Sequence, residues 1–474
     1  MEVTDAGRGP AARVLAAVLA RSHLAVTSPG ATLGLPRDTT FTTSVVIVGG
    51  DATVASRVEG DVVVVGGNLF LRPGARIAGR AIAIGGGVYD SFLARVDGGR
   101  TSFRDVTYDA RLDGGRALLA QRRLDVRSVE PLVWPGVYGL RIPTYDRAAG
   151  LSLGAGPRLT FGSLPVAAEP AVTYRSHLGD FDPSILVEVG AGRPVWLEAR
   201  AERGVYTNDA WSRPDVLNSA ATLVFGDDER NHYRADRVEA AIAARRTWDL
   251  LEGTARIRVL AEDASSLGPG PGESSEPWSM LGRDDTTRML RPNPAVRPGR
   301  ITSVGPQLAA TWSDGEMSAR ATLGVEIPLS SVQDLRFVQS TADVRVSFPA
   351  VSNHLFEGHV HVVHTAGDAA PPQRWAYLGG GSTLPTRDEL SLGGDQLFFA
   401  EGLYEVPLRG PELPFVGAPT VGVRYAVGSA GVDRLPDLTQ NVALLVRVSL
   451  LRVEVVVDPA DGTTAVRFGG SAFR

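Results

Sequence analysis

From about residue 137 to its end, the chain alternates between apolar and polar positions, which is the period-two pattern of β-strands with two different faces. In the segment 420–427, Val421, Val423 and Tyr425 share one face, while Arg424 lies on the other. The pattern recurs in segments close to the ~10 residues that a tilted spanning strand needs, among them 195–202, 237–245, 255–262, 318–327, 341–348 and 441–450. It predicts an antiparallel region of about 12–16 strands.

Charged side chains recur on the polar faces of these segments. The arginines are Arg237, Arg256, Arg258, Arg320, Arg345, Arg424, Arg447 and Arg452, and the acids are Glu198, Glu239, Glu262, Glu326 and Glu454. A soluble sandwich gives the same alternation, but burying such groups in a dry core costs several kcal/mol each. A water-filled lumen solvates them. We therefore expect a transmembrane β-barrel with Leu323, Val325 and Val344 facing lipid and a lumenal ladder of Arg–carboxylate pairs.

A short repeat precedes this region. The segment 45–50, Val-Val-Ile-Val-Gly-Gly, recurs at 62–67 and, as Ala-Ile-Ala-Ile-Gly-Gly, at 81–86. This spacing predicts stacked coils of a parallel β-solenoid, with glycine corners and inward apolar residues. The inward positions are expected to be Val63 or Val65 and Ile82 or Ile84. A dinucleotide fold also begins with a strand and glycines, but it needs a helix directly afterwards, and here another valine strand follows.

These patterns divide the chain into four parts. Residues 1–40 form an N-terminal segment, whose apolar stretch 14–20 is interpreted as a degenerate or truncated signal. Residues 41–92 form the solenoid, residues 93–136 a linker, and residues 137–474 the barrel.

Composition narrows the classes of function. The 474 residues include no Cys, which excludes disulfides, and no Lys, so arginine supplies the basic charge. The net charge of −5 gives no indication of a nucleic-acid partner. The 54 Gly and 31 Pro residues suit many short strands and turns.

Two parts of the chain resemble known protein families. The segment 60–67, Gly-Asp-Val-Val-Val-Val-Gly-Gly, resembles the bactofilin-like β-helix repeats. The segments 145–154, 217–228 and 378–408 resemble, in order, parts of the surface-antigen superfamily of outer-membrane barrels. That family includes assembly factors and two-partner secretion transporters, and the resemblance implies a barrel-only relative without POTRA domains. The family's Arg-Gly-aromatic lid tip is absent, and Arg387 is the only candidate equivalent.

Two clusters suggest site chemistry. Glu357, His359 and His361 share one face of a strand, with His364 nearby, and two such histidines with a carboxylate could bind Zn²⁺; a solvated lumen wall is the favoured interpretation. The acidic run 227–229 could contribute to a Ca²⁺ site, but a charged periplasmic turn is expected instead. The sequence therefore assigns no catalytic, cofactor-binding or metal-binding residue, and no cofactor.

The expected function is that of a non-enzymatic outer-membrane β-barrel with a periplasmic solenoid, in a structural or transport- and assembly-related role. One alternative is a cell-surface β-rich adhesion or structural protein without a membrane span. Another is a lipid hydrolase with its site in the lumen. The expected partners are outer-membrane lipid, with peptidoglycan or other envelope proteins beside it, and neither nucleic acid nor nucleotide. Cargo, pore state and oligomeric state stay open.

Overall fold

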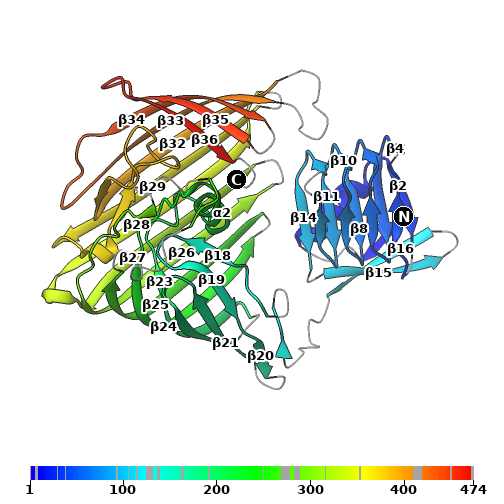
Figure 1. Ribbon diagram of the computed structural model, residues 1–474. Helices are drawn as coiled ribbons and strands as arrows, with labels where there is room; N and C mark the ends of the chain where they lie inside the picture. The colour runs from blue at the N-terminus through cyan, green and yellow to red at the C-terminus, as the bar shows by residue number, and fades with distance from the viewer. Residues whose placement is uncertain are drawn as a thin grey trace. The chain divides into compact units, whose positions relative to one another are not determined.

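In the computed structural model, the chain forms two compact units, built mainly from residues 1–129 and mainly from residues 130–474. Both are β-rich, and the described residues contain two α-helices (Figure 1). None of the helices described is long and apolar enough to cross a membrane. The structure describes residues 2–5, 9–28, 30–37, 39–91, 94–104, 106–113, 116–123, 132–135, 139–161, 165–190, 193–248, 250–267, 278–281, 289–314, 317–351, 354–408, 419–448 and 451–470.

The first unit contains a parallel β-solenoid in which each coil contributes one strand to each of three sheets. The first sheet contains β2 (His23–Thr27), β5 (Ser44–Val48), β8 (Val62–Val65), β11 (Ala81–Ile84) and β14 (Arg100–Phe103). The second contains β3 (Leu33–Leu35), β6 (Ala52–Val54), β9 (Leu69–Leu71) and β12 (Val88–Asp90). The third contains β4 (Thr40–Phe41), β7 (Arg57–Val58), β10 (Arg76–Ile77) and β13 (Arg95–Val96). The first coil thus begins ahead of residue 41.

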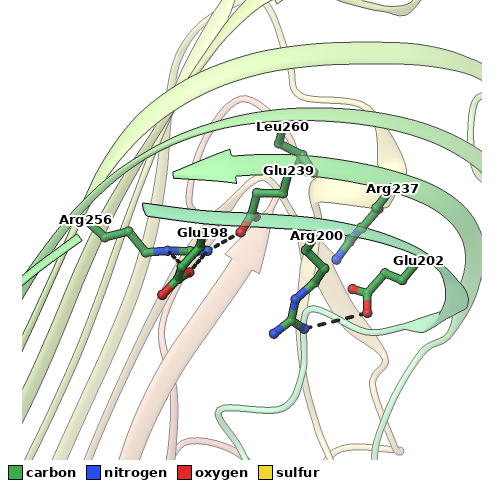
Figure 2. Close-up of a pocket in the computed structure, with 7 residues that line it drawn as sticks. All are labelled: Glu198, Arg200, Glu202, Arg237, Glu239, Arg256 and Leu260. Carbon is green, nitrogen blue, oxygen red and sulfur yellow. Dashed lines mark hydrogen bonds and ion pairs between the residues drawn. The ribbon is translucent and has the colours of Figure 1, made fainter. Parts of the chain in front are cut away.

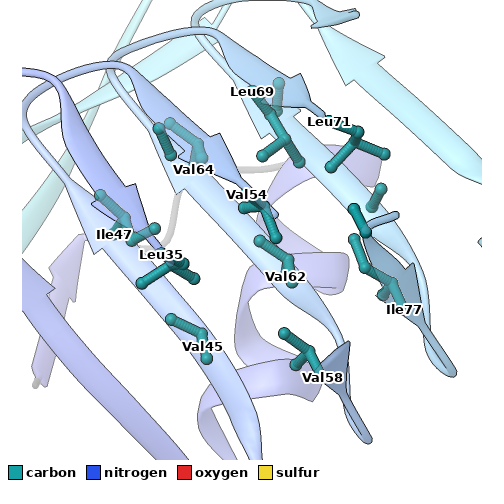
Figure 3. Close-up of a cluster of buried hydrophobic side chains, with 14 residues drawn as sticks. Leu35, Val45, Ile47, Val54, Val58, Val62, Val64, Leu69, Leu71 and Ile77 are labelled. Carbon is teal, nitrogen blue, oxygen red and sulfur yellow. The ribbon is translucent and has the colours of Figure 1, made fainter. Parts of the chain in front are cut away.

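The valine runs of the solenoid are buried on both faces. One set of side chains, including Val45, Ile47, Val62 and Val64, fills the interior (Figure 3). The residues expected inside, Val63, Val65, Ile82 and Ile84, instead point outward. These outward side chains are covered by α1 (Pro10–Leu19) and by the hairpin of β15 (Val106–Asp113) and β16 (Arg116–Arg123). Strand β1 (Glu2–Asp5) pairs with β16.

The prediction of the inward set was therefore wrong, because a strand buried on both sides shows no alternation that distinguishes its faces. The apolar stretch 14–20 lies almost entirely in α1, where Leu15 and Val18 are buried against the solenoid.

The glycine corners leave no room for a side chain. A Cβ added at Gly67 would lie 2.2 Å from the carbonyl oxygen of Gly50 in the preceding coil. We expect Gly67→Ala to destabilise the solenoid by about 1–3 kcal/mol through overpacking, seen as faster amide hydrogen exchange in β8 and β11. Gly34→Ala is the matched control, because nothing lies within 4 Å of its added Cβ. Equal exchange in both variants would contradict the close stacking.

The second unit is an antiparallel sheet that curls into a barrel (Figure 1). Among the residues described it has 18 strands, more than the about 12–16 expected. The difference arises because the 18 include three short strands near the start of the sheet. The strands are β17 (Leu132–Val133), β18 (Thr144–Asp146), β19 (Gly150–Ala155), β20 (Arg158–Phe161), β21 (Val166–Arg175), β22 (Asp180–Val189), β23 (Val195–Tyr206), β24 (Tyr233–Trp248), β25 (Leu251–Ser266), β26 (Gly299–Ser313), β27 (Ser318–Ser330), β28 (Phe337–Pro349), β29 (Leu355–Gly367), β32 (Gln396–Pro407), β33 (Thr420–Gly431), β34 (Thr439–Val448), β35 (Leu451–Val457) and β36 (Thr464–Gly470).

The outward faces of these strands are apolar and exposed. Leu323 is 47% exposed, Leu444 67% and Val344 37%, although all three are aliphatic. The same holds on strand after strand for Val195, Leu197, Val238, Ile242, Ile257, Val259, Leu308, Ile327, Val360, Val423 and Val455. Monomeric soluble proteins rarely expose a contiguous apolar surface of this kind.

Connections at the two ends of the barrel differ in length. At one end, β24–β25, β26–β27 and β28–β29 are joined by a few residues. At the other, segment 207–232 carries helix α2 (Asp215–Phe225), and segment 368–395 carries the 3-10 turn η2 (Pro372–Arg374) with strands β30 (Ala376–Leu378) and β31 (Leu392–Gly394). The 3-10 turn η1 (Val332–Asp334) lies in the connection from β27 to β28. We call the two segments 207–232 and 368–395 the inner segments, since their side chains contact the lumenal wall.

Candidate functional site

The lumenal faces of β23, β24 and β25 carry alternating arginines and glutamates (Figure 2). The guanidinium Nη2 of Arg256 lies 2.7 Å from Oε2 of Glu198, and Nη1 of Arg258 lies 3.1 Å from Oε2 of Glu239. A cavity of about 390 Å³ lies among these side chains, and its lining is almost entirely charged. This part of the lumen is therefore a polar chamber.

Arg–carboxylate pairs line the wall, but only some of them join different strands, as an interstrand ladder requires. Arg447 on β34 lies 2.9 Å from Glu405 on β32, whereas Arg452 contacts Glu454 within β35 and Arg345 contacts Asp343 within β28. Arg237 contacts Glu262. Arg320, by contrast, is exposed. Glu326 differs from the expectation, because its partner comes from an inner segment and not from a neighbouring strand.

That partner is Arg374, which joins two strands of the wall. Its Nη1 lies 2.6 Å from Oε1 of Glu262 on β25. Its Nε and Nη2 lie 2.9 and 3.1 Å from the two carboxylate oxygens of Glu326 on β27, a two-bond contact. The side chain of Arg374 is 6% exposed, so its charge is compensated inside the protein. The inner segment 368–395 is thereby held in the lumen.

A second arginine holds the same segment from the opposite direction. The Arg424 side chain on β33 is 2% exposed and lies 2.7 Å from Glu401 and 3.7 Å from Glu454. It also donates a hydrogen bond of 2.8 Å to the carbonyl oxygen of Thr383. The interior of the barrel is therefore occupied by chain in this region, and not by water alone.

The acidic run 227–229 is buried, so the expectation of a charged periplasmic turn was wrong. Nη2 of Arg213 lies 3.0 Å from Asp227 and 2.7 Å from Glu229. The backbone N–H of Arg147, between β18 and β19, donates to Asp228 at 3.0 Å. These acids need partners from other segments of the chain, which no local pattern reveals.

The same run links the second strand of the sheet, β18, with the last strand, β36. Arg147 follows β18, and Arg467 on β36 lies 3.3 Å from Glu229. The connection between β25 and β26 joins this network as well, because Nη2 of Arg291 donates to the carbonyl oxygen of Asp228 at 3.0 Å. The interior network thus connects β18, near the start of the sheet, with the last strand, β36.

Burial and the neighbouring Asp227 raise the pKa of the Glu389 carboxyl to about 8, from its usual 4.5. Between these values the folded protein binds a proton that the unfolded chain has lost, so stability falls as pH rises toward 8. We expect Glu389→Gln to remove this decline, measured as the temperature of the heat-dependent gel shift from pH 5 to pH 9. The exposed neighbour provides the control, Asp388→Asn, which should keep the decline. A wild-type protein that is equally stable across this range would contradict the prediction.

Arg387, the candidate equivalent of the lid-tip arginine, contacts the turn between β35 and β36. Its Nη2 lies 3.1 Å from Asp458 and 3.5 Å from Asp461. Asp458 is fully buried and Arg387 is half-buried. The residue thus ties segment 368–395 to the end of the barrel sheet.

The histidines on β29 meet a carboxylate from the adjacent strand. His359 and His361 lie on the lumenal face, as predicted, and both contact Asp343 on β28. The indole of Trp211 stacks on the ring of His361, with centroids 4.0 Å apart. His364 lies on the opposite, exposed face and contacts Gln396. The sequence did not indicate Asp343 or Trp211 as members of this cluster.

A second group of metal-ligating residues, Asp146, Asp228 and His232, lies beside α2. Its oxygens are already in use. Asp146 accepts the backbone N–H groups of Ala148 and Ala149 at 2.9 and 2.6 Å, and Asp228 accepts from Asn218 at 2.8 Å and from His232 at 3.0 Å. The buried Arg147 guanidinium is 3.8 Å away and would repel a cation. The group is best explained as a hydrogen-bond network.

Helix α2 was not predicted, although a local signal was present. Pro214 precedes its first turn, and Gly226 ends it with φ of 70° in the left-handed region, where glycine is favoured. The helix buries Asn218 and Thr222 while Leu223 and Phe225 remain exposed. Its apolar pattern therefore does not identify its buried face.

No family model matches the chain, and no curated protein does so either. Among solved structures, CdiB from Acinetobacter baumannii shows 10% identity with a TM-score of 0.39, covering 77% of this chain and 65% of its own. BamA from Haemophilus ducreyi lacking POTRA domains 1–3 shows 11% identity and a TM-score of 0.42, covering 77% and 74%. CdiB from Escherichia coli shows 10% identity and 0.40, covering 77% and 67%. The chain thus spans about two thirds to three quarters of these proteins.

Proposed function

We propose that this chain is a non-enzymatic outer-membrane β-barrel that carries a periplasmic solenoid and has a structural or transport- and assembly-related role. The observation that carries the proposal is the opposite character of the two barrel faces. Exposed aliphatic side chains cover the outward face, while the inward face holds Arg–carboxylate pairs. A sheet with lipid outside and a polar lumen inside stabilises both faces.

The lengths of the connections between strands indicate which end of the barrel faces the periplasm. Outer-membrane barrels have short periplasmic turns and longer extracellular loops. The short connections between β24 and β25 and between β26 and β27 then lie on the periplasmic side, and the inner segments enter from the outside. In this proposal the solenoid lies in the periplasm, where peptidoglycan or other envelope proteins are its candidate partners.

The inner segments favour a closed barrel over an open pore. Arg374 of the inner segment 368–395 contacts Glu262 and Glu326 on the wall. Arg424 on the wall contacts Glu401 and donates to the carbonyl oxygen of Thr383 in that segment. These contacts hold the segment against the wall. The remaining charged chamber is about 390 Å³. A role that depends on opening would require these ion pairs to break.

Membrane insertion and closure can be tested on the purified protein. We expect heat-modifiable migration, extraction only by detergent, and no stable conductance of the intact chain in a planar bilayer. Deleting residues 379–391 should produce a conducting channel, because this segment then no longer occupies the lumen. Its ion selectivity should shift on Arg256→Glu, since a ring of charges sets selectivity.

Two results would contradict this function. A chain that stays in solution without detergent would favour the β-rich surface protein that does not span the membrane. Turnover of lipid or ester substrates by the intact protein would favour the lumenal hydrolase. Stable conductance of the intact chain would contradict closure alone.

A further inference from the structure

The outward face of the second solenoid sheet carries two stacked aromatic rings, which we call the aromatic platform. Strands β9 and β12 pair in parallel register, with Phe70 opposite Tyr89. Their ring centroids lie 5.3 Å apart, and the ring planes differ by 18°. Leu69 and Leu71 point into the coil and are buried (Figure 3), whereas Tyr89 is 47% exposed. The rings therefore present a flat surface to solvent.

Two arginines lie at the corner between the second and third sheets, and we call them the corner arginines. The backbone N–H of Arg72 donates to the carbonyl oxygen of Val54 in the preceding coil, so the pairing of β9 continues to this residue. Arg72 is exposed and takes the next outward position after Phe70. Nη2 of Arg37 donates to the carbonyl oxygen of Pro73 at 3.1 Å. The aromatic platform is thus bordered by positive charge.

Three more arginines form a column on the third sheet, which we call the arginine column. Arg57, Arg76 and Arg95 occupy equivalent positions of β7, β10 and β13, and each lies directly opposite the next. Neighbouring strands are about 4.8 Å apart, and like charges directly opposite one another are destabilising. The side chains of Arg57 and Arg95 are each 57% exposed. The column is therefore a repeated positive charge that an anion with a similar repeat would stabilise.

Acidic side chains compensate the arginine column only in part. Two residues after the three arginines stand Glu59, Ala78 and Asp97, in that order. Glu59 and Asp97 each lie 2.7 Å from the arginine of their own coil, whereas the middle coil has alanine at this position. Among the side chains described here, the three column arginines and the two corner arginines face these two acids. The surface is locally positive, although the whole chain has a net charge of −5.

We propose that the aromatic platform, the corner arginines and the arginine column together bind a linear polysaccharide that carries carboxylate groups. The negative π face of an aromatic ring attracts the C–H groups on the face of a sugar ring. A guanidinium binds a carboxylate through two parallel hydrogen bonds. The inference rests on the proposed function, which places the solenoid in the periplasm, and it names the class of partner there.

A membrane surface fits these two sheets less well. A segment that lies on a membrane needs a row of exposed apolar side chains to bury in it. In the described part of the second and third sheets, Tyr89 is the one large apolar side chain that is exposed. A single ring beside five arginines suits a sugar chain better than a lipid surface.

The test is binding of polygalacturonate to the full chain in detergent, measured by calorimetry, with neutral dextran as the comparison ligand. We expect binding of polygalacturonate that weakens with added salt, and no binding of dextran. Arg76→Ala and Tyr89→Ala should each weaken binding about tenfold, whereas Tyr89→Phe should bind as the wild type does. Arg122→Ala is the matched control, because Arg122 is 58% exposed on β16, which covers the first sheet.

Folding of the variants is checked separately. Amide hydrogen exchange in β8 and β11 as slow as in the wild type identifies the variants whose solenoid is intact. If Arg76→Ala or Tyr89→Ala is not intact, Arg72→Ala or Phe70→Ala takes its place. Polyglutamate serves as a carboxylate chain without sugar rings. The inference is overturned if the wild type does not bind polygalacturonate, if dextran or polyglutamate binds equally well, or if the intact variants bind as the wild type does.

Sedimentation with purified peptidoglycan distinguishes two sources of the carboxylates. Co-sedimentation would identify the cell wall as the partner, and binding of polygalacturonate alone would identify a free acidic polysaccharide; both results support the binding surface. Membrane insertion is measured independently by heat-modifiable migration. A barrel that inserts but does not bind polygalacturonate would therefore overturn this inference and leave the proposed function intact.

Discussion

Replacing Arg374 with alanine is expected to cost about 3–5 kcal/mol of folding free energy, since breaking a buried ion pair leaves an uncompensated charge behind. Two carboxylates depend on this residue: Glu326 through a two-bond contact, and Glu262 through one bond of 2.6 Å. The measurement is the midpoint of urea unfolding in detergent, or the temperature of the gel shift. Proteolysis should also detect the released inner segment 368–395.

A surface arginine gives the matched control for this loss. Arg203 on β23 contacts Asp236 at 2.7 Å, but both side chains are about half exposed. Solvent screens such a pair, so Arg203→Ala should leave unfolding essentially unchanged. The double variant Arg374→Met with Glu326→Gln should be more stable than Arg374→Met alone, because the second substitution removes one of the two carboxylate charges left without a partner. Equal effects of Arg374→Ala and Arg203→Ala would show that the inner segment is not held by this pair.

Replacing Val344 with arginine is expected to cost about 2–4 kcal/mol, the effect of a cation at the lipid-facing midplane of a barrel. Val344 lies near the middle of β28, opposite Val360 of β29, and its side chain is exposed on the apolar face. The assay is folding into lipid vesicles followed by urea titration. The effect should grow with bilayer thickness, since a thicker bilayer leaves the charge farther from water.

The control introduces the same residue on the other face of the same strand. Thr341 is exposed and has the parity of the lumenal residues Asp343 and Arg345. Thr341→Arg should therefore be tolerated, because its charge is solvated by lumenal water. If both variants fold equally well, the apolar face does not contact lipid, and the barrel does not span a membrane in the proposed orientation.

The two substitutions test different parts of one arrangement. Val344→Arg concerns the wall alone, whereas Arg374→Ala concerns the contact between the wall and the chain inside it. A protein that tolerated Arg374→Ala but not Val344→Arg would be a membrane barrel with a loosely held interior. Conductance should then appear without any deletion.

The sequence by itself determined the properties that depend on neighbouring residues. Alternation is local, so it assigned Leu323 and Val344 to the outside and Arg424 and Glu262 to the inside, and the structure agrees. The glycine-ended repeat likewise identified the solenoid, because each corner needs glycine where it touches the coil before it. It also placed His359 and His361 on the lumenal face.

Only the tertiary structure decided which charges meet and which apolar face lies inside. Arg374 is 48 residues from Glu326 and 112 from Glu262, and a pairing over such a distance leaves no local pattern. The run 227–229 is polar enough for a surface turn and is buried only because arginines from other segments compensate it. Val63 and Val65 could face either side of their strand, because α1 and the β15–β16 hairpin bury the outer face as completely as the coils bury the inner one.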